Sequence, residues 1–298
     1  MQEAMRPPRV LVIGSTGMLG TAVTLQLQRQ GLEVVESSRT RGLRFDAEID
    51  DLNLLIEASG LDQGDYVVNC VGLTKTHLKE SDSAATERAV RLNVLFPISL
   101  VRVAEKFDLR IIQVATDCVF SGNQGQYVEA MAHDPLDVYG KSKSLGEIQS
   151  EKVLHLRCSL IGPELSGRNS LFFEWVRNLE LGAVVDGFVN HRWNGLTSMA
   201  FGSIVSGLIS SRAFYPGVQH LVPANSLSKF ELVQLELELL GRDDVTLTPS
   251  ERGSRVDRTL STSFPDKNEL LFRLAGFKAI PTIGEMMDAL PWAELRSN

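Results

Sequence analysis

A short apolar run at 10–13 is followed at once by three glycines, each separated from the next by two residues, and then by the apolar spacing of a helix. A strand that runs through a glycine turn into a helix offers free backbone N–H groups and the positive end of the helix dipole to an anion. Glycines also let the backbone approach a pyrophosphate closely. We therefore expect the turn to bind a dinucleotide through Gly14, Thr16, Gly17, Met18, Leu19 and Gly20. The competing interpretation is a plain tight turn.

The pattern of β-branched runs and helical stretches in the first half predicts a parallel sheet. Strands are expected at 10–13, 33–35, 66–69, 110–114 and 153–156, and one long helix at 84–106. The even spacing that a barrel needs fails after about residue 160, so the fold class is α/β with a doubly wound Rossmann sheet.

The second half is rich in loops, and we expect it to form a smaller α/β substrate-binding domain. The predicted boundaries are 1–160 for the dinucleotide-binding domain and 161–298 for the second, with the segment 199–224 returning to the first. Helices are predicted at 171–181, 199–211 and 229–240. Ser228 with Glu231, and Thr282 with Glu285, have the spacing of capping boxes at helix starts.

Composition excludes several classes of function. The 298 residues carry 30 Lys and Arg against 37 Asp and Glu, a net charge of -7, so we expect no nucleic-acid partner. No run approaches 18 apolar residues, so we expect no membrane span. The 3 cysteines are too few for a disulfide framework, and no cluster has the spacing of a metal site. These features favour a cytoplasmic protein without a metal.

A tyrosine and a lysine four residues apart, Tyr139 and Lys143, would lie on one face of a helix. A free tyrosine has a pKa of about 10, and a nearby cation would favour its anionic form. Thr116 follows the predicted strand 110–114, at the edge where a doubly wound sheet binds ligands. Its hydroxyl can donate to a carbonyl oxygen, so these three residues are the candidate catalytic group. An isolated match of this kind could also be an exposed helix face.

The glycine spacing, Asn69, Asn93, Thr116 and the Tyr139/Lys143 pair together resemble the extended short-chain dehydrogenases/reductases, in the family's order. The resemblance implies NAD(P)H as cofactor, with Tyr139 as proton donor, Lys143 also holding the nicotinamide ribose and Asn93 bracing the active-site backbone. Further cofactor contacts are expected from Ser38, Arg39, Asp46, Asn69, Cys70, Val71, Gly72 and Asn93. Arg39, where an acidic residue would bind the ribose of NAD, favours NADPH, although NADH stays open.

The segments 116–122 and 135–147 resemble the dTDP-4-dehydrorhamnose reductase family, whose members usually carry Tyr where Cys118 stands. The resemblance implies reduction of a nucleotide-linked 4-keto-6-deoxysugar in deoxysugar or polysaccharide biosynthesis. It implies substrate contacts from Asp117, Cys118, Arg168, Asn169, Arg192, Trp193 and Arg255. Arg258 also resembles the family's late arginine contact, as Arg255 does. Trp193 could instead be a core residue and Arg192 a surface charge.

Two other functions stay open. Cys118 and the loop that carries His191 would also suit a nucleotide-sugar epimerase or an epimerase–reductase. A non-catalytic NADP-binding regulatory subunit is the second alternative, because some relatives serve another enzyme as partners. A homodimer is expected by analogy alone.

Overall fold

The computed structural model describes residues 6–78, 81–164 and 171–292. Its centre is a seven-stranded sheet in which all neighbouring strands are parallel, in the order β11-β6-β5-β4-β1-β2-β3. The strands are β1 (Arg9–Ile13), β2 (Glu33–Ser38), β3 (Leu43–Arg44), β4 (Tyr66–Asn69), β5 (Arg110–Ala115), β6 (Val153–Arg157) and β11 (Gly217–His220). The strand order reverses between β1 and β4, which confirms the predicted doubly wound Rossmann fold.

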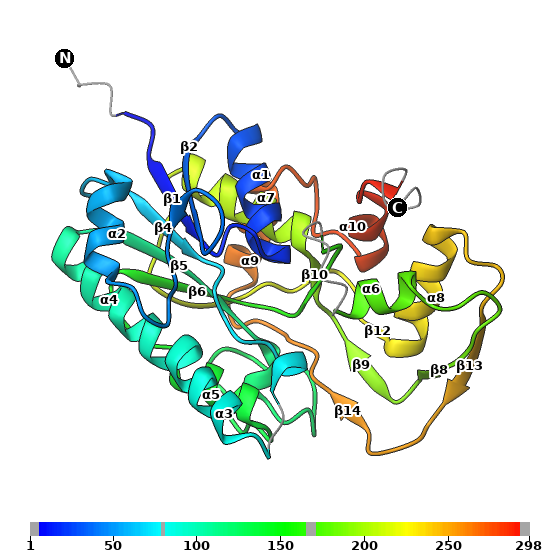
Figure 1. Ribbon diagram of the computed structural model, residues 1–298. Coiled ribbons are helices and arrows are strands. Elements are labelled where there is room, and N and C mark those ends of the chain that lie inside the picture. The colour runs from blue at the N-terminus through cyan, green and yellow to red at the C-terminus, as the bar shows by residue number, and fades with distance from the viewer. Residues whose placement is uncertain (1–5, 79–80, 165–170, 293–298) are drawn as a thin grey trace.

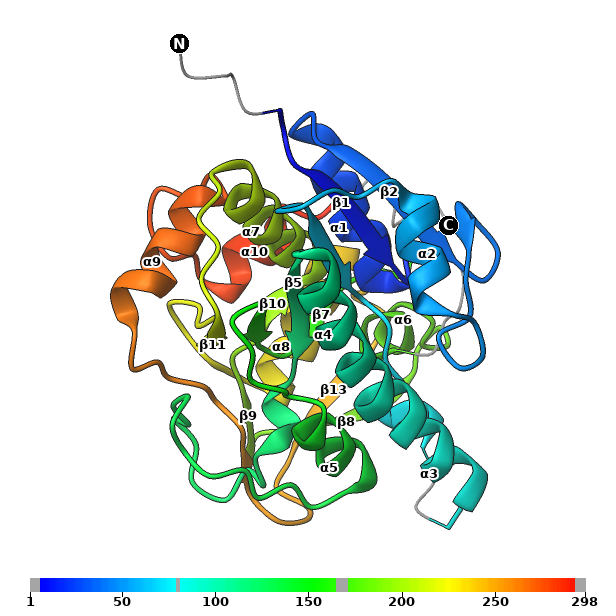
Figure 2. The same ribbon diagram turned by 90° about the vertical axis from the view of Figure 1, so that its left-hand side faces the viewer.

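Helices cover both faces of this sheet (Figures 1 and 2). Helices α1 (Met18–Arg29) and α7 (Ser198–Ser210) lie side by side on one face, and α2 (Leu52–Ser59) and α4 (Phe96–Phe107) cover the other. Strand β1 shows why both faces need a cover. Val10 and Val12 pack into the core that includes α1 and α7, whereas Leu11 and Ile13 pack into the core that includes α2 and α4. A strand that is apolar on both faces belongs in the middle of such a sheet.

The long helix predicted at 84–106 is present but not regular. It consists of α3 (Ser83–Val90), a π-helical turn η2 (Arg91–Leu95) and α4, with Pro97 in the first turn of α4. Proline has no N–H to donate to the preceding turn, which suits a break in the α-helical ladder at this point. Such π-turns often mark functional positions, and this one contains Asn93.

The second half returns to the sheet and then builds a smaller region. Strand β11 pairs with β6, and α7 packs on α1. The segment 199–224, which we predict to return to the first domain, contains both elements except Ser198, the first residue of α7. The remaining helices are η1 (Lys75–His77), η3 (Asp117–Val119), α5 (Val138–Leu145), α6 (Phe172–Arg177), α8 (Lys229–Leu240), α9 (Pro265–Leu274) and α10 (Ile283–Asp288). The short strands are β7 (Leu160–Ile161), β8 (Val184–Phe188), β9 (His191–Trp193), β10 (Leu196–Thr197), β12 (Leu227–Ser228), β13 (Thr246–Ser250) and β14 (Val256–Asp257).

Both predicted capping boxes are confirmed, at the start of α8 and at the start of α10. Each cap satisfies backbone N–H groups that have no partner within the helix. Across the described ranges, no helix combines the length and the apolar character needed to cross a membrane.

Candidate active site

The glycine turn lies where the strand order reverses, between β1 and α1. Gly14 has a φ of 82°, and a Cβ there would meet the backbone of Cys70 at 3.2 Å, so the turn needs glycine. A Cβ on Gly20 would lie 2.1 Å from the Gly14 carbonyl oxygen, so α1 can begin this close to the turn only with glycine there. Thr16, Gly17 and Met18 are partly exposed, whereas Leu19 and Gly20 are buried and shape the turn from behind.

The start of α1 is open to an anion. Gly17 caps the helix without a side-chain hydrogen bond, and no acidic residue lies in the first turn. A Cβ on Gly17 would meet only the Gly14 carbonyl oxygen, at 3.5 Å. The free N–H groups of this turn therefore suit the pyrophosphate of a dinucleotide. An open helix start of this kind fits NAD(P)H. Among the described residues, no group of His, Cys, Asp and Glu could hold a metal ion.

Two buried asparagines hydrogen-bond the loop after β4. The Asn69 amide donates to Gln113 at 2.9 Å and accepts from the Val71 N–H at 3.0 Å. The Asn93 amide binds both backbone groups of Leu73 and donates to the Ser142 hydroxyl at 3.0 Å. Both side chains are buried and already engaged with protein groups. They brace the backbone of Cys70, Val71 and Gly72, which faces the glycine turn.

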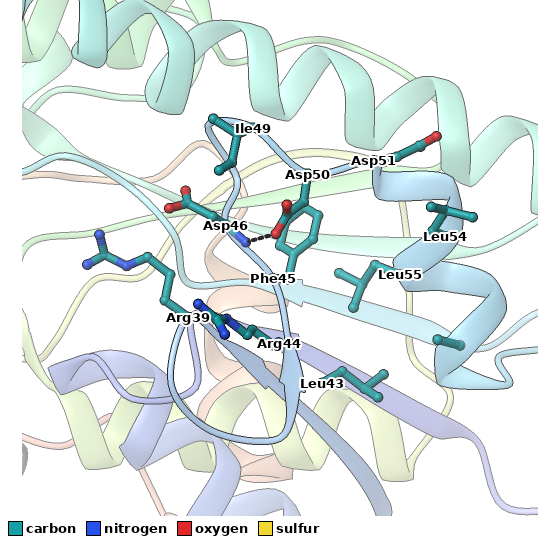
Figure 3. Close-up of a pocket in the computed structure, with 11 residues that line it drawn as sticks. Arg39, Leu43, Arg44, Phe45, Asp46, Ile49, Asp50, Asp51, Leu54 and Leu55 are labelled. Carbon is teal, nitrogen blue, oxygen red and sulfur yellow. Dashed lines mark hydrogen bonds between the residues drawn. The ribbon is translucent and has the colours of Figure 1, made fainter.

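A pocket of about 680 Å³ opens beside the end of β2 (Figure 3). Arg39, Arg44 and Asp46 line one part of it, and Leu54 and Leu55 of α2 line another. Arg39 is exposed and free to meet a phosphate, while Asp46 accepts from the Glu48 N–H at 3.0 Å.

Ser38, a predicted cofactor contact, is hydrogen-bonded within its own turn. Its hydroxyl accepts from the Arg41 N–H at 2.8 Å and donates to the Arg41 carbonyl at 2.9 Å. The side chain is buried and shapes the turn that carries Arg39.

Thr116, Tyr139 and Lys143 converge at the end of β5. Tyr139 and Lys143 lie on α5, whose first turn is capped by Asp137 through the Gly140 N–H at 2.8 Å. The Lys143 ammonium donates to the Val114 carbonyl at 3.0 Å and lies 4.0 Å from the position a Cβ would take on Gly72. The lysine therefore connects the tyrosine helix to the loop after β4.

The environment of Tyr139 differs from our expectation. We expected Lys143 to favour the anionic form, but burial raises the pKa of Tyr139, Cys118 adds to the rise, and the Thr116 hydroxyl opposes it. Burial also lowers the pKa of Lys143, which Glu147 partly offsets. In this structure Tyr139 is thus a neutral phenol, in the protonated form that a proton donor needs.

The segment after Thr116 is built into the short helix η3. The Thr116 hydroxyl accepts from the Cys118 N–H and donates to the Asp117 carboxylate, both at 3.2 Å. Burial raises the pKa of Asp117, although Arg258 and Lys229 lower it. Burial likewise raises the pKa of Cys118 to about 12, so the thiol is protonated near neutrality and is a poor base.

The predicted substrate residues of the second half take different positions. The Trp193 indole is buried, and Arg192 donates to the Ser226 hydroxyl at 2.6 Å and pairs with Glu231 at 3.5 Å. Arg255 is 72% exposed and pairs with Asp257 at 3.4 Å. Arg168 and Asn169 lie outside the described residues.

Two further cations lie near the site, and the sequence indicated only the first of them. Arg258, predicted together with Arg255 as a late arginine contact, donates to the Phe120 carbonyl at 3.0 Å and acts on the pKa of Asp117. Lys229, at the start of α8, also acts on Asp117. The capping box at Ser228 placed Lys229 at the first position of a helix, but nothing in the sequence connects that position to Thr116.

Comparisons with known proteins agree with this geometry. The family described as RmlD substrate binding domain matches residues 8–267. The chain is 28% identical over 261 residues to the probable low-salt glycan biosynthesis reductase Agl14 of Haloferax volcanii, an alignment that covers 83% of this chain and 85% of that protein. It is 27% identical over 251 residues to the dTDP-4-keto-6-deoxy-D-glucose reductase of Streptomyces niveus, covering 82% and 83%.

A solved structure has the same fold. The dTDP-4-dehydrorhamnose reductase of Bacillus anthracis, crystallised in complex with NADP, matches with a TM-score of 0.76 at 18% identity, over 95% of this chain and 98% of that one. The family match spans most of the chain, from the first strand of the sheet into α9. The chain therefore belongs to the RmlD substrate binding domain family.

Proposed function

We propose that this protein is an NADPH-dependent reductase of a nucleotide-linked 4-keto-6-deoxysugar, acting in deoxysugar or polysaccharide biosynthesis. One observation carries the proposal: Thr116, Tyr139 and Lys143 meet at the end of β5, beside a glycine turn whose helix start is open to a pyrophosphate. The names of the two relatives, both reductases and one of them acting on a dTDP-linked ketosugar, support the same reaction.

Tyr139, Thr116 and Lys143 each have a separate role in the proposed reaction. Bound NADPH supplies the hydride that adds to the ketone carbon. Tyr139 gives its phenolic proton to the carbonyl oxygen. The Thr116 hydroxyl, which donates to Asp117 in the free protein, turns to donate its hydrogen bond to the same oxygen. Water returns a proton to Tyr139, so that one ketone, one hydride and one proton give one alcohol. Lys143 holds the nicotinamide ribose and keeps a positive charge beside the phenolate that the proton transfer leaves.

The test is oxidation of NADPH by the purified protein with dTDP-, UDP- and GDP-linked 4-keto-6-deoxysugars. We expect turnover with one nucleotide and a fall in kcat of about 10²- to 10⁴-fold for Tyr139→Phe, with NADPH affinity unchanged. Tyr127→Phe is the control, because the Tyr127 hydroxyl bonds only Ser121 and the backbone N–H groups of Gly122 and Gln124. Its ring stacks on Phe120 at 4.3 Å, a contact that phenylalanine would keep. Full activity of Tyr139→Phe would remove Tyr139 from the mechanism.

The reductase is favoured over the two alternatives. An epimerase needs a base that removes a carbon-bound proton, and the raised pKa of Cys118 makes that thiol unsuitable. A purely regulatory subunit would not need Thr116, Tyr139 and Lys143 together. Solvent deuterium that appears at a carbon next to the ketone would favour the epimerase, and cofactor binding without any turnover would favour the regulatory subunit.

The homodimer and the cytoplasmic location are also part of the proposal. Exposed apolar side chains on neighbouring helices, Val90 of α3, Leu95 of η2 and Leu145 of α5, offer a surface for a second copy. The free thiols Cys70, Cys118 and Cys158 suit a reducing compartment. Sedimentation at micromolar concentration tests the dimer, and a monomer mass for the native chain would contradict it.

A further inference from the structure

Lys229 is a largely buried cation with an unusual surrounding. It occupies the first position of α8, directly after Ser228, whose hydroxyl accepts from the Glu231 N–H at 3.1 Å. Its ammonium lies 4.8 Å from the ring centroid of Phe172 and 5.1 Å from that of Trp193. Within the described ranges, no hydrogen bond or ion pair to a carboxylate holds this ammonium.

The fold holds Lys229 in place from two sides. Strand β12 pairs with β9, so that Leu227 lies opposite Trp193, two residues before the lysine. Helix α6, which begins at Phe172, packs on α8. Figure 1 shows α6, β9, β12 and the start of α8 gathered together beside the sheet. The two rings that contact the ammonium are therefore carried by elements that pack on α8 or on the strand before it.

The strands beside Lys229 continue to the segment that follows β5. Strand β14 pairs with β9, and the Asp257 N–H of β14 donates to the Gly122 carbonyl at 2.7 Å. Burial lowers the pKa of Lys229, while Asp117 and Cys118 raise it and Arg258 lowers it. Lys229 and Arg258 in turn both lower the pKa of Asp117, which follows Thr116 directly. Lys229 therefore lies within electrostatic range of the segment that carries Thr116.

The ammonium of Lys229 has no bonded anion among the described residues. Its ring contacts are cation–π contacts, which offset only part of the cost of taking an ammonium out of water. Arg258, the other cation that acts on Asp117, also acts on the carboxylates of Asp134 and Asp137. Glu236, two turns further along α8, is fully buried, and burial raises its pKa well above the ordinary range. An anionic oxygen of a ligand would therefore supply the partner that Lys229 lacks.

We propose that Lys229, walled by Phe172 and Trp193, binds an anionic oxygen of the nucleotide-sugar substrate and selects for it. The inference rests on the proposed function, because it takes the substrate to be a nucleotide sugar. Two groups could bring that oxygen, the diphosphate of the nucleotide or a carboxylate on the sugar. Lys229 is a binding residue in this scheme and moves no proton.

The experiment compares the ligand affinity of variants by calorimetry. The ligands are a nucleoside diphosphate, the same nucleotide carrying a neutral hexose and the same nucleotide carrying a hexuronic acid. We expect Lys229→Met to weaken binding about 10- to 100-fold and Lys229→Arg to stay close to the native affinity. Lys267→Met is the matched control, since that ammonium lies over Tyr215 and Phe264 at 4.3 and 4.9 Å but is exposed and acts on no residue of the site.

The pattern of losses identifies the source of the anion. An equal loss for all three ligands assigns the diphosphate, and a loss confined to the hexuronic acid assigns the sugar carboxylate. Native affinity of Lys229→Met for every ligand, with an unchanged melting temperature, would overturn the inference.

A second measurement needs no variant. In the native chain, reductive methylation should label Lys229 more slowly when the bound ligand covers it, and Lys267 at the same rate with and without ligand. Equal labelling of Lys229 in both conditions would overturn the inference even if Lys229→Met did not fold. Neither readout uses turnover, so a native protein that binds these ligands but reduces no ketosugar would contradict the proposed function alone.

Discussion

At the scale of single residues, the two ends of the cofactor site depend on isolated cations. Arg39 is an exposed side chain at the end of β2, in the turn that Ser38 shapes. Lys143 is partly buried at the other end, and its ammonium donates to the Val114 carbonyl. Arg39 can distinguish NADPH from NADH through its charge. Lys143 can lose its charge at alkaline pH.

Arg39→Ala should raise the dissociation constant of NADPH about 10- to 100-fold and leave that of NADH nearly unchanged, because only NADPH carries a 2′-phosphate. Fluorescence titration with each cofactor measures both values. Arg41→Ala is the control, since Arg41 belongs to the same turn but pairs with Glu36 at 3.3 Å. Equal weakening of both cofactors by Arg39→Ala would argue against the phosphate contact.

The pH profile should report Lys143 and not Tyr139. Burial lowers the pKa of Lys143, so its positive charge is lost as the pH rises through a value below the ordinary 10.5, whereas the raised pKa of Tyr139 keeps the phenol protonated. We expect kcat/KM to fall on the alkaline side, at a pH below the ordinary pKa of lysine. In Lys143→Arg, whatever activity remains should show no such fall up to pH 10, because arginine keeps its charge. An unshifted alkaline limb in that variant would contradict the assignment.

At the scale of elements, close backbone contacts and buried charged groups limit which substitutions a helix tolerates. The first turn of α1 meets the glycine turn through Gly20, and α8 places Glu236 in the core beside Glu174 of α6. Both positions give predictions that concern stability first.

Gly20→Ala should lower the free energy of unfolding by about 1–3 kcal/mol, because its Cβ would lie 2.1 Å from the Gly14 carbonyl oxygen and backbone would have to move. Gly17→Ala is the comparison. Its Cβ has room in the free protein, so stability should stay constant while NADPH affinity falls, since a methyl group would stand where the pyrophosphate approaches. Urea unfolding measures the stability and cofactor titration measures the affinity. An unfolding free energy of Gly20→Ala equal to that of the native chain would contradict the predicted loss of stability.

Glu236→Gln should stabilise the protein at pH 8 by about 1–3 kcal/mol and have little effect at pH 4.5. The physical reason is linkage. Burial, and then Glu174, raise the pKa of Glu236 well above 4.5, so above that pH the unfolded chain releases a proton that the folded chain keeps, and stability falls as the pH rises. Thermal melting across this range measures it. Glu238→Gln, an exposed residue of the same helix, should change neither value.

At the scale of the whole molecule, one apolar core joins the two halves of the chain. It contains Leu19, Val23 and Leu27 of α1 together with the buried face of α7 and residues of α8 and α10. The Ser206 hydroxyl of α7 also donates to the Gln26 carbonyl at 3.1 Å. The first half therefore depends on a helix that follows it by some 40 residues in the chain.

A fragment of residues 1–160 should lack a cooperative thermal transition. Without α7 it would expose the inner face of α1, at a cost of about 1.5–3 kcal/mol for each large apolar side chain that returns to water. Near-ultraviolet circular dichroism during heating is the measurement, with the full chain as reference. Cooperative melting of the fragment would show that 1–160 is an independent domain.

The sequence alone was enough wherever the cause is local. The glycine turn, the strand β1 and the capping boxes at Ser228 and Thr282 are read from neighbouring residues, and the Tyr139–Lys143 spacing follows from the pitch of one helix. Their order along the chain also indicated the doubly wound sheet, because few topologies satisfy alternating strands and helices.

Only the tertiary structure decided the features that join distant segments. Strand β11, at one edge of the sheet, pairs with β6, about 60 residues earlier in the chain, and has no periodicity of its own. Arg255 and Arg258 are three residues apart and match the same family contact equally well. Packing nevertheless leaves Arg255 exposed, whereas Arg258 donates to the Phe120 carbonyl. Burial likewise raised the pKa of Tyr139, where spacing had predicted the opposite. Spacing determines which residues share a face, but desolvation and charge depend on what the rest of the chain packs against them.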